Sequence, residues 1–208
     1  MNDLALPYDL FLLAHSEAGI RLPHKPALCA GLAGALVSQL LIDGAVTLVG
    51  DSLAAGREVR HTDPSAAKLA GAVGVRRMRV REWLPLVAAD LYEETAAQLV
   101  AQRVVAEERR GLFRNQRSYP PVGTTPLVRA RSRIRLPLTG GKVPEAGDLV
   151  LCALVPMLGL EETLYLSESP GQIRPRLAVL AAAAPAPLRA VMRDVEDYMG
   201  DLATAVYR

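Results

Sequence analysis

Residues 27–42, ALCAGLAGALVSQLLI, form the longest nearly apolar run of the chain and decide its fold. Apolar side chains would cover almost the whole circumference of a helix here, so other helices must surround it. The 16 residues, interrupted by Ser38 and Gln39, fall short of the roughly 18 to 20 residues that span a bilayer. The run therefore predicts a buried central helix, with Pro26 in its first turn.

The segments next to this run predict shorter elements. Residues 8–14 are apolar and predict a short helix or strand. Asp43-Gly44 ends the central helix, and the β-branched residues of segment 45–49 predict a strand. Residues 57–61 can return as the hairpin partner of that strand across a loop at residues 51–56.

Apolar spacing predicts most of the remaining helices. A helix from residue 82 to about residue 103 is predicted by one apolar face, formed by positions 84, 87, 91, 95 and 99. Pro85 fits only in the first turn of this helix. Thr125-Pro126 is typical of a helix start. The arginines that follow alternate as on a strand but also form i,i+4 pairs, so periodicity leaves helix or strand open for residues 125–137. Residues 148–158 and 173–184 predict apolar helices, and a long amphipathic C-terminal helix is marked by Leu188, Val191, Val195, Tyr198, Leu202 and Val206.

Length and composition favour one cytoplasmic globular domain. The chain has 208 residues, 50% of them hydrophobic, which suffices for a substantial core. We expect a single, mainly α domain over residues 1–208, a helical bundle around the buried central helix with a projecting β-hairpin. Cys29 and Cys152 each lie in an apolar run, which favours core positions in a reducing compartment over a disulfide. The N-terminus has no basic region and has acids on both sides of its short apolar stretch, so it is not typical of a signal peptide.

Basic residues are concentrated in the middle of the chain. Residues 103–135 hold nine arginines and two acids, Glu107 and Glu108, which gives this segment a net charge of +7. Residues 136–208 hold six bases and nine acids. An anionic partner is therefore expected to meet the middle segment.

A hydrolase motif is suggested by Gly50-Asp51-Ser52-Leu53, since a strand followed by these residues is how the GDSL hydrolases place their nucleophilic serine. Such a serine needs a base that takes its proton. The family's Asp-x-x-His near the C-terminus is missing, because the only histidine after Ser52 is His61, and so is the oxyanion-hole asparagine. We therefore interpret the motif as a polar turn between two strands and expect no enzyme activity.

Metal and phosphate sites are also unsupported by the sequence. His15, His24 and His61 share no metal-ligand spacing with one another or with the cysteines. No Gly-x-x-x-x-Gly-Lys or Gly-x-Gly-x-x-Gly opens a helix after a strand. No catalytic residue, metal or cofactor is predicted.

The segment RRGLFRNQR, residues 109–117, is predicted to be the basic tip of a hairpin formed by residues 107–117. Two apolar residues among four arginines suit an anionic membrane, where cations meet lipid headgroups while Leu112 and Phe113 enter the interface. The same segment suits DNA, because a helix followed at once by a basic hairpin is the order of a winged helix. A third interpretation is a contact between subunits without any ligand.

Several motifs occur in a fixed order over most of the chain. Residues 6–19 are an apolar stretch followed by an acid and a glycine, and residues 31–48 read GLAGALVSQLLIDGAVTL. Residues 99–108 read LVAQRVVAEE, and RSYP follows at residues 117–120. This arrangement resembles the Golgi phosphoprotein 3 family, whose members begin with LLLLAL, continue with GLAGALLAELALRGRIAL and close a hairpin with RYP.

The resemblance implies a helical fold with a buried central helix, surrounding amphipathic helices and a projecting β-hairpin. Eukaryotic members bind phosphatidylinositol 4-phosphate on Golgi membranes and recruit glycosyltransferases by their cytoplasmic tails, and their hairpin supports membrane contact and self-association. For this chain it implies a peripheral protein at the cytoplasmic membrane surface, with anionic lipid as its partner. Cytoplasmic tails of membrane proteins and a second copy of the chain are further expected partners, and nucleic acid is the alternative.

The lipid pocket of those members uses a tryptophan and three arginines. By block-to-block matching, the tryptophan falls on His24, the first arginine on Ala33, and the others on Ala89 and Tyr92, so none of the four is kept. A phosphoinositide headgroup needs several cationic donors, so specificity for phosphatidylinositol 4-phosphate is not expected from this pocket. The candidate lipid contacts are instead the hairpin residues Arg109, Arg110, Leu112, Phe113, Arg114 and Arg117.

Overall fold

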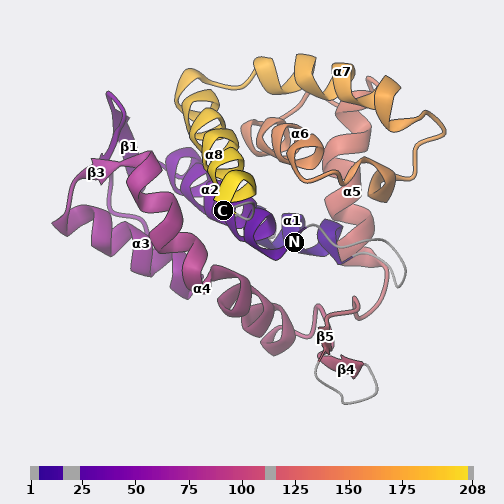
Figure 1. Cartoon of the computed structure of the whole chain (residues 1–208), viewed down its shortest axis with the longest axis horizontal. Helices are drawn as coiled ribbons and strands as arrows, with labels where there is room; N and C mark the ends of the chain where they lie inside the picture. Colours follow the sequence, from indigo (N-terminus) through magenta and orange to yellow (C-terminus); the bar gives the residue numbers. More distant parts are fainter. Residues whose placement is uncertain (1–4, 16–23, 111–115, 206–208) are drawn as a thin grey trace.

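The computed structural model describes residues 5–15, 24–110 and 116–205, and these form a mainly α domain. Its helices are α1 (Leu6–Ala14), α2 (Lys25–Ile42), α3 (Pro64–Val75), α4 (Val80–Ala101), α5 (Thr125–Leu138), α6 (Ala146–Met157), α7 (Pro170–Ala182) and α8 (Ala186–Ala205), with a 3-10 turn at Glu161–Leu164. Its strands are β1 (Val46–Val49), β2 (Ser52–Ala55), β3 (Met78–Arg79), β4 (Glu108–Arg110) and β5 (Gln116–Ser118). The expected fold class is confirmed (Figure 1).

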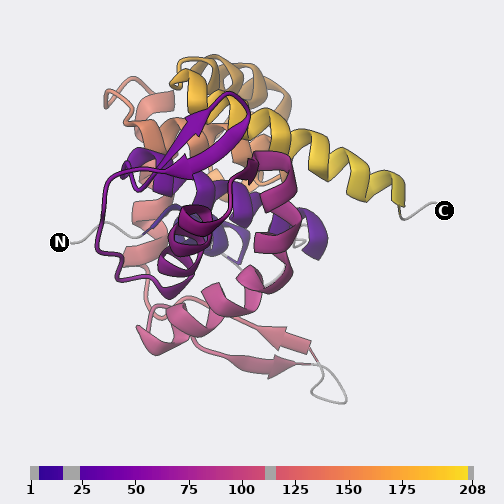
Figure 2. The same ribbon diagram turned by 90° about the vertical axis from the view of Figure 1, so that its left-hand side faces the viewer.

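The central helix is α2, which runs through the middle of the bundle (Figures 1 and 2). It packs against α1, α4, α6 and α8. Helix α2 has 18 residues, two more than the apolar run seen in the sequence, and by length and composition alone it could cross a membrane. In the fold, however, 61% of the helix is buried against the rest of the protein. A Cβ on Gly34 would lie 2.4 Å from Cγ2 of Val195, so this glycine allows α8 to approach α2 closely. Cys152 is buried and Cys29 half-buried, and both are free thiols.

A three-stranded antiparallel sheet in the order β1-β2-β3 follows α2. The predicted partner of β1 at residues 57–61 is wrong, because β1 pairs instead with β2 in a register that places Val49 opposite Ser52. The chain turns within Gly50 and Asp51, and Gly50 adopts φ 68°, a conformation that glycine accepts without strain. The Gly-Asp-Ser-Leu motif therefore forms a tight turn between two strands, as interpreted.

Helix α3, between β2 and β3, was not predicted. The Asp63 carboxylate caps α3 by accepting hydrogen bonds from the backbone N–H groups of Ser65 and Ala66. Helix α4 begins at Val80, so the prediction that Pro85 lies in its first turn is wrong. The capping box between Arg79 and Glu82 starts the helix early, and burial of Val80 adds one turn to its apolar face.

The predicted basic hairpin is present as β4 and β5, which project from the helical body after α4 (Figure 1). The register pairs Glu108 with Ser118 and Arg109 with Arg117. Leu112, Phe113 and Arg114 lie outside the described residues. The segment 125–137, left open between helix and strand, is the helix α5. The helices predicted at residues 148–158 and 173–184 and at the C-terminus correspond to α6, α7 and α8.

Candidate functional site

The base of the β4–β5 hairpin brings cationic residues together. Arg109 and Arg110 lie in β4 and Arg117 in β5, so three of the six candidate lipid contacts belong to one two-stranded ladder. Arg109 is directly opposite Arg117. Like charges at opposite positions of an antiparallel pair destabilise it, so nearby anions should stabilise this ladder.

Two acids provide part of that compensation at Arg117, whose side chain is 55% exposed. Its Nε lies 3.6 Å from Oε1 of Glu107, and its Nη1 lies 3.7 Å from Oε2 of Glu93. Both distances exceed an ordinary hydrogen bond. Exposed ion pairs of this kind contribute about 1 kcal/mol or less, so Arg117 can exchange them for another anion.

A chain of alternating charges ties the hairpin to the helices behind it. Lys25, at the start of α2, donates to Oε1 of Glu93 on α4 at 2.8 Å, and Glu93 in turn faces Arg117. The Lys25 ammonium also lies 4.4 Å from the centre of the Tyr92 ring. Sequence reasoning missed Lys25 and Glu93, because partners 68 residues apart leave no local signal.

Four aromatic rings pack behind these charges. The Phe11 and His15 rings are stacked with centroids 4.0 Å apart, and Tyr92 and Tyr119 meet both at tilted or edge angles. His15 is buried between two partners: Nδ1 lies 2.8 Å from the carbonyl oxygen of Phe11, and Nε2 lies 3.0 Å from the hydroxyl of Tyr92. A neutral imidazole satisfies both, donating to the carbonyl and accepting from the hydroxyl. Burial lowers the pKa of His15 to about 4, against a smaller rise from the Phe11 carbonyl.

This buried histidine predicts acid-sensitive stability. The unfolded chain takes up the His15 proton near pH 6.5 and the folded chain only near pH 4, so folding loses stability as the pH falls between these values. The gap corresponds to about 3 kcal/mol. Urea unfolding of the parent and of His15→Gln, at about pH 7.5 and about pH 4.5, should show a smaller pH effect in the variant. Equal losses in both proteins would contradict the assignment.

The four positions matched to the family's lipid pocket lie on α2 and α4. His24 is the exposed N-cap residue of α2, and Ala33 is fully buried within that helix. Ala89 is exposed and Tyr92 half-buried, one turn apart on α4. Of the four, Tyr92 lies next to the hairpin, through its contacts with Tyr119 and Lys25.

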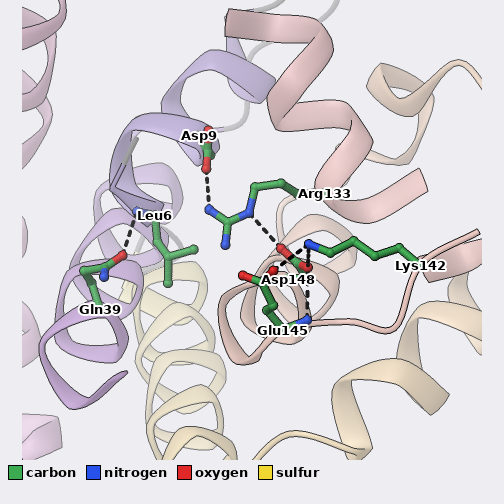
Figure 3. Close-up of polar contacts among 7 residues, drawn as sticks. All are labelled: Leu6, Asp9, Gln39, Arg133, Lys142, Glu145 and Asp148. Atoms are coloured by element: carbon green, nitrogen blue, oxygen red, sulfur yellow. Dashed lines mark hydrogen bonds and ion pairs between the residues drawn. The ribbon is translucent and has the colours of Figure 1, made fainter. Parts of the chain in front are cut away.

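Two arginines of α5, Arg131 and Arg133, are occupied within the fold. Arg131 donates from Nε to the carbonyl oxygen of Thr163 at 2.7 Å. Arg133 bridges three helices, with Nη1 2.6 Å from Asp9 on α1 and Nε 2.7 Å from Asp148 on α6 (Figure 3). Both carboxylates are 0% exposed. These two arginines of the basic middle segment are therefore structural.

Arg133 also lines a groove of about 660 Å³, together with Asp43, Arg60, Asp63 and Glu145. Lys142 adds a second cation to Asp148 at 3.2 Å, and Asp148 accepts from the Glu145 backbone N–H at 3.1 Å (Figure 3). A Cβ on Gly147 would lie 2.4 Å from Nη2 of Arg133, so glycine leaves room for the guanidinium. The groove mixes acidic and basic groups and shows no preference for one sign of charge.

Hydrolase or metal chemistry finds no support in the described parts of the chain. The Ser52 hydroxyl donates to the carboxylate of its neighbour Asp51 at 2.9 Å, and within residues 5–15, 24–110 and 116–205 no hydrogen bond joins it to a histidine. The same residues contain no group of three or more His, Cys, Asp or Glu that could hold a metal ion.

Comparison with known proteins gives a family match. A search of curated proteins finds no similar chain. The family profile for Golgi phosphoprotein 3 (GPP34) matches residues 6–198, which include α1, the central helix, the hairpin and most of α8. The match covers nearly the whole chain and agrees with the order of the motifs and with the helical fold. The chain therefore belongs to the Golgi phosphoprotein 3 family.

Proposed function

We propose that this protein is a peripheral membrane-associated protein that binds anionic phospholipid through its β4–β5 hairpin. The observation that carries the proposal is the pairing of Arg109 with Arg117 on a two-stranded element that projects from the helical body (Figures 1 and 2). Arg110 adds a third cation beside this pair, and the intervening sequence adds Leu112, Phe113 and Arg114. Each cation near an anionic membrane surface gains about 1 kcal/mol.

The recognition we propose is of charge and not of one headgroup. The four positions of the family's phosphoinositide pocket hold His24, Ala33, Ala89 and Tyr92, and none of them supplies an arginine. Lys25, at the start of α2, and Arg117, in the hairpin, are linked through Glu93 and can meet a phosphate at the surface. We infer a location at the cytoplasmic face of a membrane, an adaptor role toward cytoplasmic tails of membrane proteins, and self-association through the hairpin.

Vesicle flotation tests the proposal. The protein is expected to float with vesicles that contain phosphatidylserine and to stay behind with vesicles of phosphatidylcholine alone. Binding should weaken between about 0.1 M and about 1 M salt, because the Debye length falls from about 10 Å to about 3 Å. Equal binding to both vesicle types, or none to either, would refute it. If a modest excess of duplex DNA competes the protein off the vesicles, the nucleic-acid alternative is favoured.

A further inference from the structure

A second surface with exposed apolar and cationic residues lies where α3 meets β3. Val75, the last residue of α3, is 91% exposed, more than any other large hydrophobic residue of the described ranges. Val49, at the β1–β2 turn, is 48% exposed. The two positions belong to one corner of the molecule, because Nη2 of Arg77 donates to the carbonyl oxygen of Val49 at 3.3 Å. We call Val49, Val75, Arg76 and Arg77 the corner patch.

The charges of the corner patch are not compensated by ion pairs. Two neighbouring arginines have acidic partners, Arg79 with Glu82 at 3.1 Å and Arg81 with Asp201 at 2.7 Å. Arg76 and Arg77 are exposed, and no acid of residues 5–15, 24–110 or 116–205 forms an ion pair with either. Glu82 lies within electrostatic reach of Arg76, but its pKa is lowered chiefly by the hydrogen bonds it shares with Arg79. The patch therefore presents two available cations beside two exposed valines.

We propose that the corner patch is a second contact to the anionic lipid surface, an inference that rests on the proposed function. Unpaired cations beside exposed apolar side chains match an anionic bilayer, which offers phosphates at its surface and an apolar layer below. Phosphates of a nucleic acid would use the arginines but leave Val75 in water. The chemistry of the patch thus favours lipid.

The corner patch and the hairpin lie at opposite ends of α4 (Figure 1). Helix α4 has 22 residues and so spans about 33 Å. Contacts at both ends would fix the direction of α4 relative to the bilayer, which a single hairpin cannot do. Two contacts on one folded chain also add their free energies, so that losses of affinity from the two sites multiply.

The test uses the full chain and vesicles of phosphatidylcholine with and without phosphatidylserine. Arg76→Gln with Arg77→Gln is expected to lower affinity for anionic vesicles about thirtyfold, the value for two cations at the membrane surface. Arg135→Gln with Arg193→Gln removes the same charge from exposed positions on α5 and α8 and should leave affinity nearly unchanged. Thermal unfolding of each variant checks that these exposed substitutions leave the fold intact.

The outcomes separate this inference from the proposed function. If the parent binds anionic vesicles and the corner variant binds as tightly, the corner patch is not a lipid contact, while the hairpin proposal stands. If the parent binds no vesicles, both fail. If the corner variant loses affinity for duplex DNA and not for vesicles, the patch contacts nucleic acid and the inference is overturned. If the corner variant loses affinity, and the variant that combines the corner and hairpin substitutions loses the product of the two separate fold-changes, the result supports two contacts on one bilayer.

Discussion

Replacing Arg109, Arg110, Arg114 and Arg117 by glutamine is expected to lower affinity for anionic vesicles by about a thousandfold. The figure follows from four cations that each gain about 1 kcal/mol at an anionic surface. Arg117 contributes least, because Glu107 and Glu93 already face its guanidinium at 3.6 and 3.7 Å. Equilibrium binding to vesicles of increasing phosphatidylserine content measures the loss.

A matched variant shows whether position or total charge matters. Four exposed arginines outside the hairpin serve as the control, namely Arg57, Arg60, Arg135 and Arg193 changed to glutamine. This control removes the same net charge and is expected to keep most of the affinity. If the control loses as much as the hairpin variant, binding depends on overall charge and not on the hairpin. If neither variant loses affinity, the hairpin is not the lipid contact.

The apolar tip residues separate insertion from charge. Leu112→Ala with Phe113→Ala should weaken binding by about 1.5 to 3 kcal/mol for each side chain that is fully inserted. The salt dependence should stay as in the parent, because the arginines remain. The arginine variant should instead lose its salt dependence together with its affinity. A salt dependence changed by the alanine variant would contradict this division of roles.

The fold was predictable from the sequence where apolar periodicity is strong. The run at residues 27–42 could only be a buried helix, and α2 confirms this. Short-range turn chemistry was harder: Gly50-Asp51 makes a two-residue turn, so β1 pairs with residues 52–55 and not with residues 57–61. Helix α3 was missed because many of its residues are alanine, glycine and valine, which give a weak amphipathic pattern.

The candidate site was predictable in part. The density of arginines in residues 109–117 is visible without a structure, and the ladder of β4 and β5 confirms the hairpin. The contacts that anchor it are not visible, since Lys25, Glu93 and Arg117 come from three distant segments. Periodicity also could not show that Arg133 faces inward, because a buried cation depends on carboxylates contributed by other helices. Arg76 and Arg77 were overlooked because they lie outside the most basic segment.

Removing the buried cation at Arg133 is expected to be the most damaging single change to stability. Arg133→Met leaves Asp9 and Asp148 buried without the guanidinium that bridges them at 2.6 and 2.7 Å. Breaking a buried ion pair by removing one partner costs about 3 to 5 kcal/mol. Asp148 keeps Lys142 at 3.2 Å as a cationic partner, which limits its share of the loss. Urea unfolding followed by the fluorescence of Trp83, the only tryptophan, measures the loss.

The double variant Asp9→Asn with Arg133→Met distinguishes an uncompensated charge from lost packing. A neutral amide costs less to bury than a carboxylate that has lost its guanidinium partner, so the double variant should regain part of the stability that Arg133→Met loses. Arg135→Met, at an exposed position two residues further along α5, is the control and should change stability by less than about 0.5 kcal/mol. If Arg133→Met behaves like this control, the bridge between α1, α5 and α6 does not stabilise the fold. If the double variant is no more stable than the single one, the loss comes from packing of the arginine side chain against Gly147 and not from its charge.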